Sequence, residues 1–452
     1  MKKLLLLICF ALSILNSYAQ TTITVMDSII FYDGYAAIIT NPPPPAGVIK
    51  HRNDLFARKL TTAEIASIGT TLQMKVLIKA LCDNYDRIGN VNLALVPTGA
   101  TTYNPDSVNR IELGRFITPF MNKNIQPDSV PYIFNIDNVA QLLKDTTLTN
   151  NFDIWIELAV FGVPYAAQTQ VAGCSGRNDV FKGKLTFITN TASPIQNTNV
   201  LTPLFFNNNF NNYQAGATDT IGLTTKSITF NVANNLSDAA FFLITSNHGS
   251  NNGGEEYIRR FHYVYYDNAL KLTYKPGRLT CEPFRQYNTQ GNGIYGSSPQ
   301  TNQQWQSFSN WCPGDVIDIR RINLGAVTAG NHTFLIRVPS AIFTGAQGNF
   351  PLSLYFQGRT AGLVAGIFDH GEYDDLFSIY PNPSNADFTI ETNSVRLQEI
   401  TVYTILGEEI IHVMNPNPIK ETLQMANFSN GLYVIHIVTD EGRFIKKLQV
   451  QH

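Results

Sequence analysis

The sequence is poor in charge. Asp, Glu, Lys and Arg make up 15% of its 452 residues, against roughly 25% in an average soluble domain. The 32 basic and 34 acidic residues leave a formal net charge of −2, and runs of Asn and Gln take the place of charges. A near-neutral chain without basic clusters binds phosphate backbones poorly. We therefore expect no nucleic-acid partner.

Long hydrophobic runs are also missing. The apolar run over residues 4–15 has about a dozen residues, whereas a membrane-spanning helix needs about 20. Lys2 and Lys3 precede this run and small residues follow it, ending at Ala19. That order is typical of a secretory signal peptide. We expect residues 1–19 to direct export and to be removed, and we expect no transmembrane segment in the mature chain.

Cysteine is scarce, and its spacing matches no common metal-binding pattern. One of the five cysteines lies in the expected signal peptide, and the other four form no CxxC or Cys/His pair. In an oxidising compartment an even set of four favours disulfide bonds. Cys281 with Cys312 is the first expected pair, and Cys82 with Cys174 follows only by elimination. The eight histidines are scattered, so the sequence predicts neither a metal site nor a cofactor.

The rest of the chain predicts an all-β protein. The 31 glycines and 22 prolines interrupt it throughout, which excludes a long helical domain and favours short strands joined by turns. Short helices are expected only at residues 61–68 and 139–144. The strands expected in the body of the chain cover residues 23–32, 73–81, 91–96, 152–163, 227–233, 239–246, 257–266 and 332–338.

Composition changes near residues 191–194 and 368–371 divide the mature chain. They predict two larger β units, residues 20–192 and 193–368, followed by a small unit at the C-terminal end.

The small unit contains three recognisable strings. Tyr-Pro-Asn-Pro stands at residues 380–383, Gly-Leu-Tyr at 431–433, and Lys-Lys at 446–447. Strands expected near 388–391 and 400–406, with a hairpin after them, predict a small Ig-like β-sandwich. An ordinary accessory module is one interpretation, but the three strings together resemble the type A sorting domain of type IX secretion. That resemblance covers residues 374–452. It implies handling by the type IX secretion machinery and a secreted or cell-surface location.

Three acids are better placed for chemistry than the others. Asp86 lies between two expected strands and next to an arginine. Glu157 lies in a strand whose other face is apolar, so it faces water or is buried with a partner. In the segment that begins at Glu256, a period of two puts Glu256, Arg260 and His262 on one face. For each acid, an exposed surface position is the simpler alternative.

Six strings occur in a characteristic order. They are Cys-Asp-Asn-Tyr-Asp-Arg at 82–87, Leu-Gly-Arg-Phe-Ile-Thr-Pro-Phe at 113–120, the Glu157 strand, His-Gly at 248–249, the segment 256–262, and Trp-Cys-Pro-Gly at 311–314. This order resembles the peptide-N-glycosidase F family, over about residues 73–338. The resemblance implies two adjacent eight-stranded antiparallel jelly-roll sandwiches with a site in the groove between them. It also implies hydrolysis of the glycosylamide bond that joins an N-glycan to asparagine in a glycoprotein or glycopeptide.

The resemblance also implies roles for single residues. Asp86 corresponds to the primary catalytic acid or base, Glu256 to the second essential carboxylate, and Glu157 to a carboxylate that contacts the substrate. Arg87 is implied to orient or bind the substrate. The further substrate-binding residues that we expect are His248, Tyr257, Arg260 and Trp311.

The chain departs from the family pattern at several positions. Gly254 and Ile258 stand where the family has cysteines on either side of the second carboxylate. Ala159 replaces an aromatic residue suited to stacking on sugar, and Phe308 and Ser309 replace an arginine. The lost ring and the lost arginine concern the substrate, so the preferred glycan stays open.

Two other functions remain as alternatives. A non-catalytic glycan- or peptide-binding protein would keep the same fold and could use Trp305, Trp311 and the many tyrosines in a binding groove. A copper monooxygenase has a related fold, but it needs clustered histidines that this sequence does not contain.

Overall fold

A computed structural model describes most of the chain. The expected signal peptide and both expected unit boundaries, near residues 192 and 368, lie outside the described residues. Within the described part, no helix has the length and apolar character needed to cross a membrane. The described residues are 20–191, 199–209, 224–250, 254–308, 310–341, 348–360, 377–392, 396–405, 408–414, 416–417, 419–439 and 442–452.

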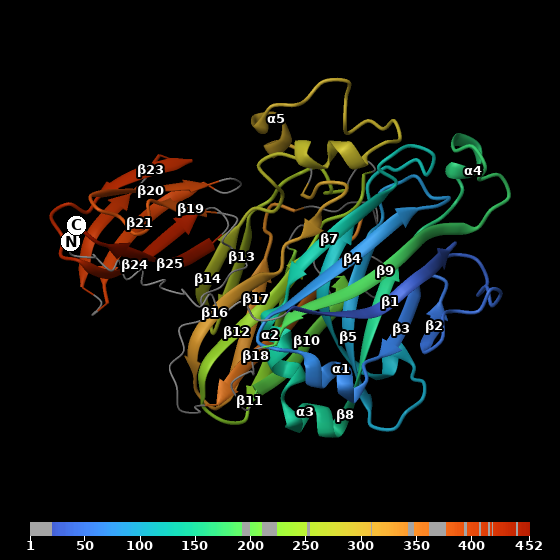
Figure 1. Ribbon diagram of the computed structural model, residues 1–452, viewed down its shortest axis with the longest axis horizontal. Helices are drawn as coiled ribbons and strands as arrows, with labels where there is room; N and C mark the ends of the chain where they lie inside the picture. The colour runs from blue at the N-terminus through green and yellow to red at the C-terminus, as the bar shows by residue number, and fades with distance from the viewer. Residues whose placement is uncertain are drawn as a thin grey trace, which may run out of the picture.

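The described residues form three β-sandwiches, which confirms the all-β prediction with paired jelly-roll sandwiches (Figure 1). In the first sandwich a sheet of order β1-β9-β4-β7 packs on a sheet of order β15-β6-β5-β8-β3-β2. The strands before the second unit are β1 Gln20–Tyr32, β2 Val48–Arg52, β3 Leu55–Lys59, β4 Leu72–Ala80, β5 Ile88–Pro97, β6 Asn109–Ile117, β7 Ser129–Asn135, β8 Phe152–Val160 and β9 Asp179–Asn190.

The second sandwich pairs the sheets β10-β18-β12-β16 and β11-β17-β13-β14, which gives the eight strands expected. The first sandwich has ten, because β15 joins one edge from the second unit and the β2–β3 hairpin extends the other. The strands of this part are β10 Asn199–Asn209, β11 Thr225–Val232, β12 Leu236–Thr245, β13 His262–Tyr266, β14 Ala269–Tyr274, β15 Val316–Ile317, β16 Arg320–Val327, β17 Gly330–Arg337 and β18 Pro351–Thr360.

The third sandwich, drawn in red in Figure 1, pairs the sheets β19-β20-β23 and β22-β21-β24-β25 around its own apolar core. It lies beside the second sandwich, where β25 contacts β14. Its strands are β19 Phe377–Tyr380, β20 Asp387–Thr392, β21 Leu397–Thr404, β22 Glu409–Met414, β23 Lys420–Gln424, β24 Gly431–Thr439 and β25 Gly442–Val450.

Helices are few and short. Both predicted ones are confirmed, as α1 and α2, and Thr61 caps α1 by a reciprocal pair of hydrogen bonds with Glu64. The helices are α1 Thr62–Ser67, α2 Asp137–Leu143, α3 Thr146–Asn151, α4 Ala167–Gln170 and α5 Asn302–Gln306, with 3-10 turns at Pro105–Ser107 and Glu282–Tyr287.

The two larger sandwiches are joined through β6. Its edge pairs with β15, and its outer face contacts β10, β12 and β18. Within this contact Glu112 and Arg115 form an ion pair at 2.7 Å, and both side chains are fully buried. Arg115 also donates to Ser246 Oγ at 2.8 Å and to the carbonyl oxygen of Pro351 at 2.9 Å, both in the second sandwich. Backbone pairing and a buried charge pair therefore fix how the sandwiches meet.

Candidate active site

The turn between β4 and β5 is held at its start by a disulfide and by a buried carboxylate. Cys82 is bonded to Cys174, with their Cα atoms 5.4 Å apart, so the pairing expected by elimination is confirmed. Asp83 is 1% exposed, and its carboxylate accepts two backbone N–H groups at 3.0 and 2.8 Å. The first candidate acid, Asp86, therefore lies in a turn fixed by a covalent bond and a buried carboxylate.

Arg87 is fixed by the same buried carboxylate. Its Nε donates to Asp83 Oδ2 at 2.6 Å, and its backbone N–H donates to Thr118 Oγ1 at 2.7 Å. No role was expected for Asp83 from the sequence, although an acid four residues before an arginine was a visible signal. The buried ion pair holds the Arg87 guanidinium beside Asp86.

Glu256 lies in a turn, because β13 begins only at His262. The strand predicted over residues 257–266 is therefore wrong in its first half. Glu256 is 8% exposed, and its Oε2 accepts the backbone N–H of Gly249 at 2.8 Å. Its carbonyl oxygen accepts Nδ2 of the buried Asn310 at 2.8 Å. These contacts hold both the backbone and the carboxylate of the second candidate acid.

Asp86 and Glu256 line one cavity of about 440 Å³. Asp86 comes from the first sandwich and Glu256 from the second, so the cavity lies between the two units. Its volume falls in the range of roughly 300–1,000 Å³ that is typical of small-molecule sites. The apolar and aromatic residues that line it are Tyr85, Ile88, Ile117, Phe120, Phe161, Tyr257 and Trp311.

The two carboxyl groups differ in how they hold a proton. Burial, and after it the charge of Glu256, raises the pKa of Asp86 to about 7, although Arg87 opposes the shift. Burial also raises the pKa of Glu256, which the Gly249 N–H opposes. Two interacting acids of this kind lose their protons in separate steps. Near neutral pH the pair can therefore supply one acid and one base.

Four of the five expected substrate-binding residues also line this cavity: Arg87, His248, Tyr257 and Trp311. His248 Nε2 lies 2.7 Å from Ser246 Oγ, and burial lowers the pKa of this histidine to about 3. Its imidazole is therefore neutral at physiological pH. Trp311 donates its Nε1 hydrogen to the carbonyl oxygen of Asn247 at 2.9 Å, which fixes the indole ring.

Glu157 does not lie at this cavity. In the β5–β8 ladder it pairs with Asn92, four residues beyond Ile88, which does line the cavity. At about 3.3 Å per residue, that register puts it roughly 13 Å away along the strand. Glu157 is fully buried and accepts hydrogen bonds from Asn92 at 3.0 Å and Tyr103 at 2.9 Å, with Arg110 at 3.5 Å. The sequence predicted that three carboxylates share one groove. In the structure Asp86 and Glu256 line the cavity, and Glu157 does not.

Arg260 and His262 do not lie there either. Arg260 pairs with the neighbouring acid Glu255, with its Nε 2.9 Å from Oε2. His262 is fully buried, bonds the carbonyl oxygen of Arg260 at 3.0 Å and stacks on Tyr274. The polar face predicted from a period of two does not form, because the residues before β13 turn and do not extend.

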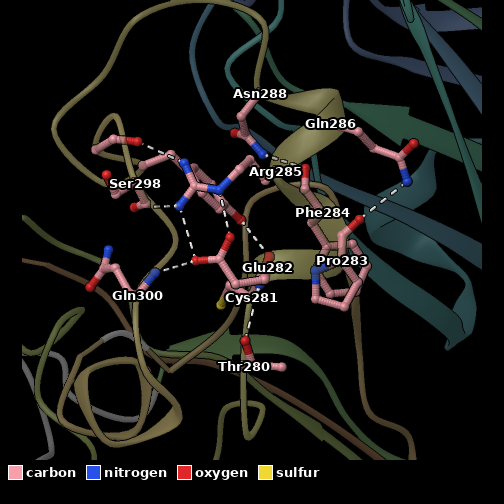
Figure 2. Close-up of polar contacts among 12 residues, drawn as sticks. Thr280, Cys281, Glu282, Pro283, Phe284, Arg285, Gln286, Asn288, Ser298 and Gln300 are labelled. Atoms are coloured by element: carbon pink, nitrogen blue, oxygen red, sulfur yellow. Dashed lines mark hydrogen bonds and ion pairs between the residues drawn. The ribbon is translucent and has the colours of Figure 1, made fainter.

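A loop closed by the predicted Cys281–Cys312 disulfide lies next to the cavity. Figure 2 shows Glu282 at the centre of its polar contacts. The Glu282 carboxylate accepts Arg285 Nε at 2.5 Å, the backbone N–H of Gln300 at 2.7 Å and Trp305 Nε1 at 3.0 Å. The hydrogen bond from Arg285 is the main cause that lowers the pKa of Glu282 to about 2. Hydrogen bonds between residues of the loop therefore hold its conformation.

No three His, Cys, Asp or Glu side chains are arranged to hold a metal ion in the described part of the chain.

Two halves of one family match the chain. The N-terminal domain of peptide-N-glycosidase F matches residues 22–175, and its C-terminal domain matches residues 217–357. The chain belongs to the peptide-N-glycosidase F family. Both sides of the cavity fall within these matches, Asp86 in the first and Glu256 in the second. Membership of this family supports an N-glycanase-like function.

The fold is shared with solved structures of PNGF-II. Two structures of PNGF-II share 21% and 19% identity with TM-scores of 0.55 and 0.52, and cover 76% and 77% of this chain. The chain spans 66% of the length of each. PNGase F from Flavobacterium meningosepticum, a glycosylasparaginase, shares 14% identity with this chain at a TM-score of 0.48. The match covers 77% of this chain and 98% of that one. No curated protein sequence matches the chain.

The third sandwich matches a secretion-system C-terminal sorting domain over residues 378–451. This match indicates type IX secretion to the cell surface or the extracellular space, as predicted.

Proposed function

We propose that the chain is a secreted amidase that hydrolyses the glycosylamide bond between an N-glycan and the asparagine of a glycoprotein or glycopeptide. The observation that carries the proposal is the pair of carboxyl groups, Asp86 and Glu256, on opposite sides of one cavity within a peptide-N-glycosidase F fold.

The proposed reaction uses both groups of the pair. Glu256, held by the Gly249 N–H, accepts a proton from water as the oxygen attacks the side-chain carbonyl carbon of the substrate asparagine. Asp86, whose raised pKa leaves a large fraction of it protonated near neutral pH, donates its proton to the departing glycosylamine nitrogen. The carbon–nitrogen bond breaks, and the products are aspartate and a glycosylamine. Proton exchange with water then restores both groups.

Arg87 and the rings around the pair have supporting roles in this proposal. Arg87 lines the cavity, and its bond to Asp83 fixes its direction, so it suits a polar group of the substrate. The neutral His248 and the fixed Trp311 ring form part of the wall on the side of the second sandwich.

The direct test is to incubate the protein with an N-glycopeptide and to follow conversion of the glycosylated asparagine to aspartate by mass spectrometry. Asp86→Asn and Glu256→Gln should each lower turnover by at least about 100-fold, since a positioned acid or base contributes about 10²–10⁴ in rate.

The matched control is Glu255→Gln, because Glu255 is the adjacent acid but is paired with Arg260 and does not line the cavity. Turnover should persist in that variant if it keeps its fold. Binding of the glycopeptide without conversion by the unaltered protein would contradict the amidase and favour the glycan-binding alternative.

A further inference from the structure

The turn that carries Glu256 lies in a stretch without regular structure. Residues 254–261 belong to no helix or strand, because β13 begins only at His262. A segment outside a sheet has no ladder of backbone hydrogen bonds and must find other partners. Two such contacts are the Gly249 N–H on the carboxylate of Glu256 and the Asn310 side chain on its carbonyl oxygen.

Arg259 supplies a third contact, at the other end of the turn. Its guanidinium donates to four backbone carbonyl oxygens: Nε to Pro276 at 2.5 Å, Nη2 to Gly277 at 2.9 Å, and Nη1 to Arg278 at 3.4 Å and Gln306 at 3.3 Å. These oxygens belong to the segment after β14 and to the end of α5. One side chain therefore ties the turn to two other segments.

The segment that Arg259 binds is itself anchored to the contact between the two larger sandwiches. The Nε of Arg278 donates to Asp315 Oδ2 at 2.7 Å, and Asp315 is 7% exposed. The carbonyl oxygen of Asp315 accepts the backbone N–H of Ile117 at 3.0 Å, at the end of β6. A continuous set of hydrogen bonds therefore runs from the turn of Glu256 to the first sandwich.

We propose that Arg259 is a positioning residue for Glu256. Its guanidinium fixes the turn, so that the Glu256 carboxylate stays on the Gly249 N–H at the cavity that Asp86 also lines. Arg259 acts through the backbone, because its side chain does not line the cavity. The catalytic role of Glu256 rests on the proposed function, whereas the hold of Arg259 on the turn does not depend on it.

The shape of the guanidinium, and not its charge, carries this role. Lysine keeps the positive charge, but its compact ammonium cannot reach four acceptors that lie on two segments. Arg259→Lys should therefore behave like Arg259→Ala. If Arg259→Lys kept the turnover that Arg259→Ala lost, the positive charge would be what matters, and the proposal would be overturned.

The activity test uses the whole chain and the glycopeptide assay. Arg259→Lys should lower kcat/KM by at least about tenfold, mainly through kcat, since a small displacement of a catalytic group can cost up to about 100-fold. Burial raises the pKa of Glu256. A loosened turn should lower that pKa and move the acidic limb of the kcat/KM profile to lower pH.

The matched control is Arg285→Lys. Arg285 also donates to carbonyl oxygens of a loop, those of Gly296 at 2.7 Å and Ser298 at 3.3 Å (Figure 2). Its hydrogen bonds go to the disulfide-closed loop and not to residues 254–261 in the part of the chain that the structure describes. Arg285→Lys should keep kcat/KM within about twofold and leave the acidic limb in place.

A second measurement does not depend on activity. The Gly249 N–H donates to the Glu256 carboxylate, so its exchange with deuterium reports whether that carboxylate stays in place. Mass spectrometry of peptides that contain Gly249 should show faster exchange in Arg259→Lys than in the unaltered protein. Arg285→Lys should leave this exchange unchanged.

Lower stability of Arg259→Lys with an unchanged acidic limb and unchanged exchange at Gly249 would overturn the proposal, because Arg259 would then have a structural role alone. The two proposals fail separately. If the unaltered protein does not hydrolyse the glycopeptide, the amidase is rejected, and the exchange at Gly249 still tests whether Arg259 fixes the turn. If hydrolysis occurs but Arg259→Lys changes neither rate nor exchange, the amidase stands and the positioning role is rejected.

Discussion

At the scale of single residues, the central feature is a carboxyl group whose pKa is raised by its surroundings. The pKa of Asp86, about 7 in the folded protein, lies well above the roughly 3.9 of an unperturbed aspartate. The folded state therefore binds this proton more tightly than the unfolded state does. Ionisation of Asp86 destabilises the fold, and this effect is absent at low pH and grows as the pH rises from about 4 to about 7.

This gives a stability prediction for Asp86→Asn. At pH 8 the variant should be more stable than the unaltered protein by about 1–3 kcal/mol, since an amide avoids the cost of a buried charge. The gain should fade as the pH is lowered toward 4. Thermal unfolding at several pH values measures it, with Asp106→Asn as the control because the Asp106 side chain is 81% exposed. A gain that did not depend on pH would argue against the raised pKa.

A second residue-scale prediction concerns Glu157. Replacing it with Gln keeps its shape but leaves Tyr103 or Asn92 without its acceptor, so stability should fall by about 1–3 kcal/mol. The kcat/KM for a glycopeptide should stay within about twofold, because Glu157 does not line the cavity. Denaturant unfolding and initial rates test both parts. Lost turnover with unchanged stability would return Glu157 to the active site.

At the scale of strands and loops, sequence prediction succeeded where the pattern is local. β4 alternates as expected, with Leu72, Met74, Val76 and Ile78 all fully buried. It failed where the outcome depends on distant segments. The residues before β13 alternate as a strand would, yet Asn310 holds that backbone in a turn. The position of Glu157 depends on the β5–β8 register, which one strand cannot reveal. Asp86 and Glu256 could be paired only through the family resemblance.

The disulfide-closed loop gives an element-scale prediction. Cys281 and Cys312 are 31 residues apart, and for a loop of that size the chain-entropy model gives a stabilisation of about 3–4 kcal/mol. Cys281→Ser with Cys312→Ser should lower the free energy of unfolding by about that amount. Denaturant unfolding measures the effect, and an unchanged free energy of unfolding would contradict it.

At the scale of the whole molecule, the site exists only because two sandwiches meet in one arrangement. Glu112 and Arg115 lie fully buried in that contact, and Arg115 donates to groups of both units. Such a pair contributes little net stability when compared with apolar residues, but losing one member leaves a buried charge uncompensated.

Arg115→Met should therefore lower the free energy of unfolding by about 3–5 kcal/mol and reduce turnover, although Arg115 does not line the cavity. Arg115→Met combined with Glu112→Leu should recover most of the stability, because no lone charge remains. Denaturant unfolding of the single and double variants measures this coupling. Equal losses in both would show that the pair acts through packing and not through charge.

The two-residue strand β15 has a consequence for which substrates can be used. It belongs to the second unit by sequence but is hydrogen-bonded into a sheet of the first, next to the turn that carries Trp311. A hinge motion that moved the two sandwiches apart would require breaking the hydrogen bonds between β15 and β6. If the proposed function holds, we expect the substrate to adapt to a groove that does not widen. We then expect a glycosylated asparagine on a flexible or unfolded segment to be a better substrate than one on a rigid protein surface.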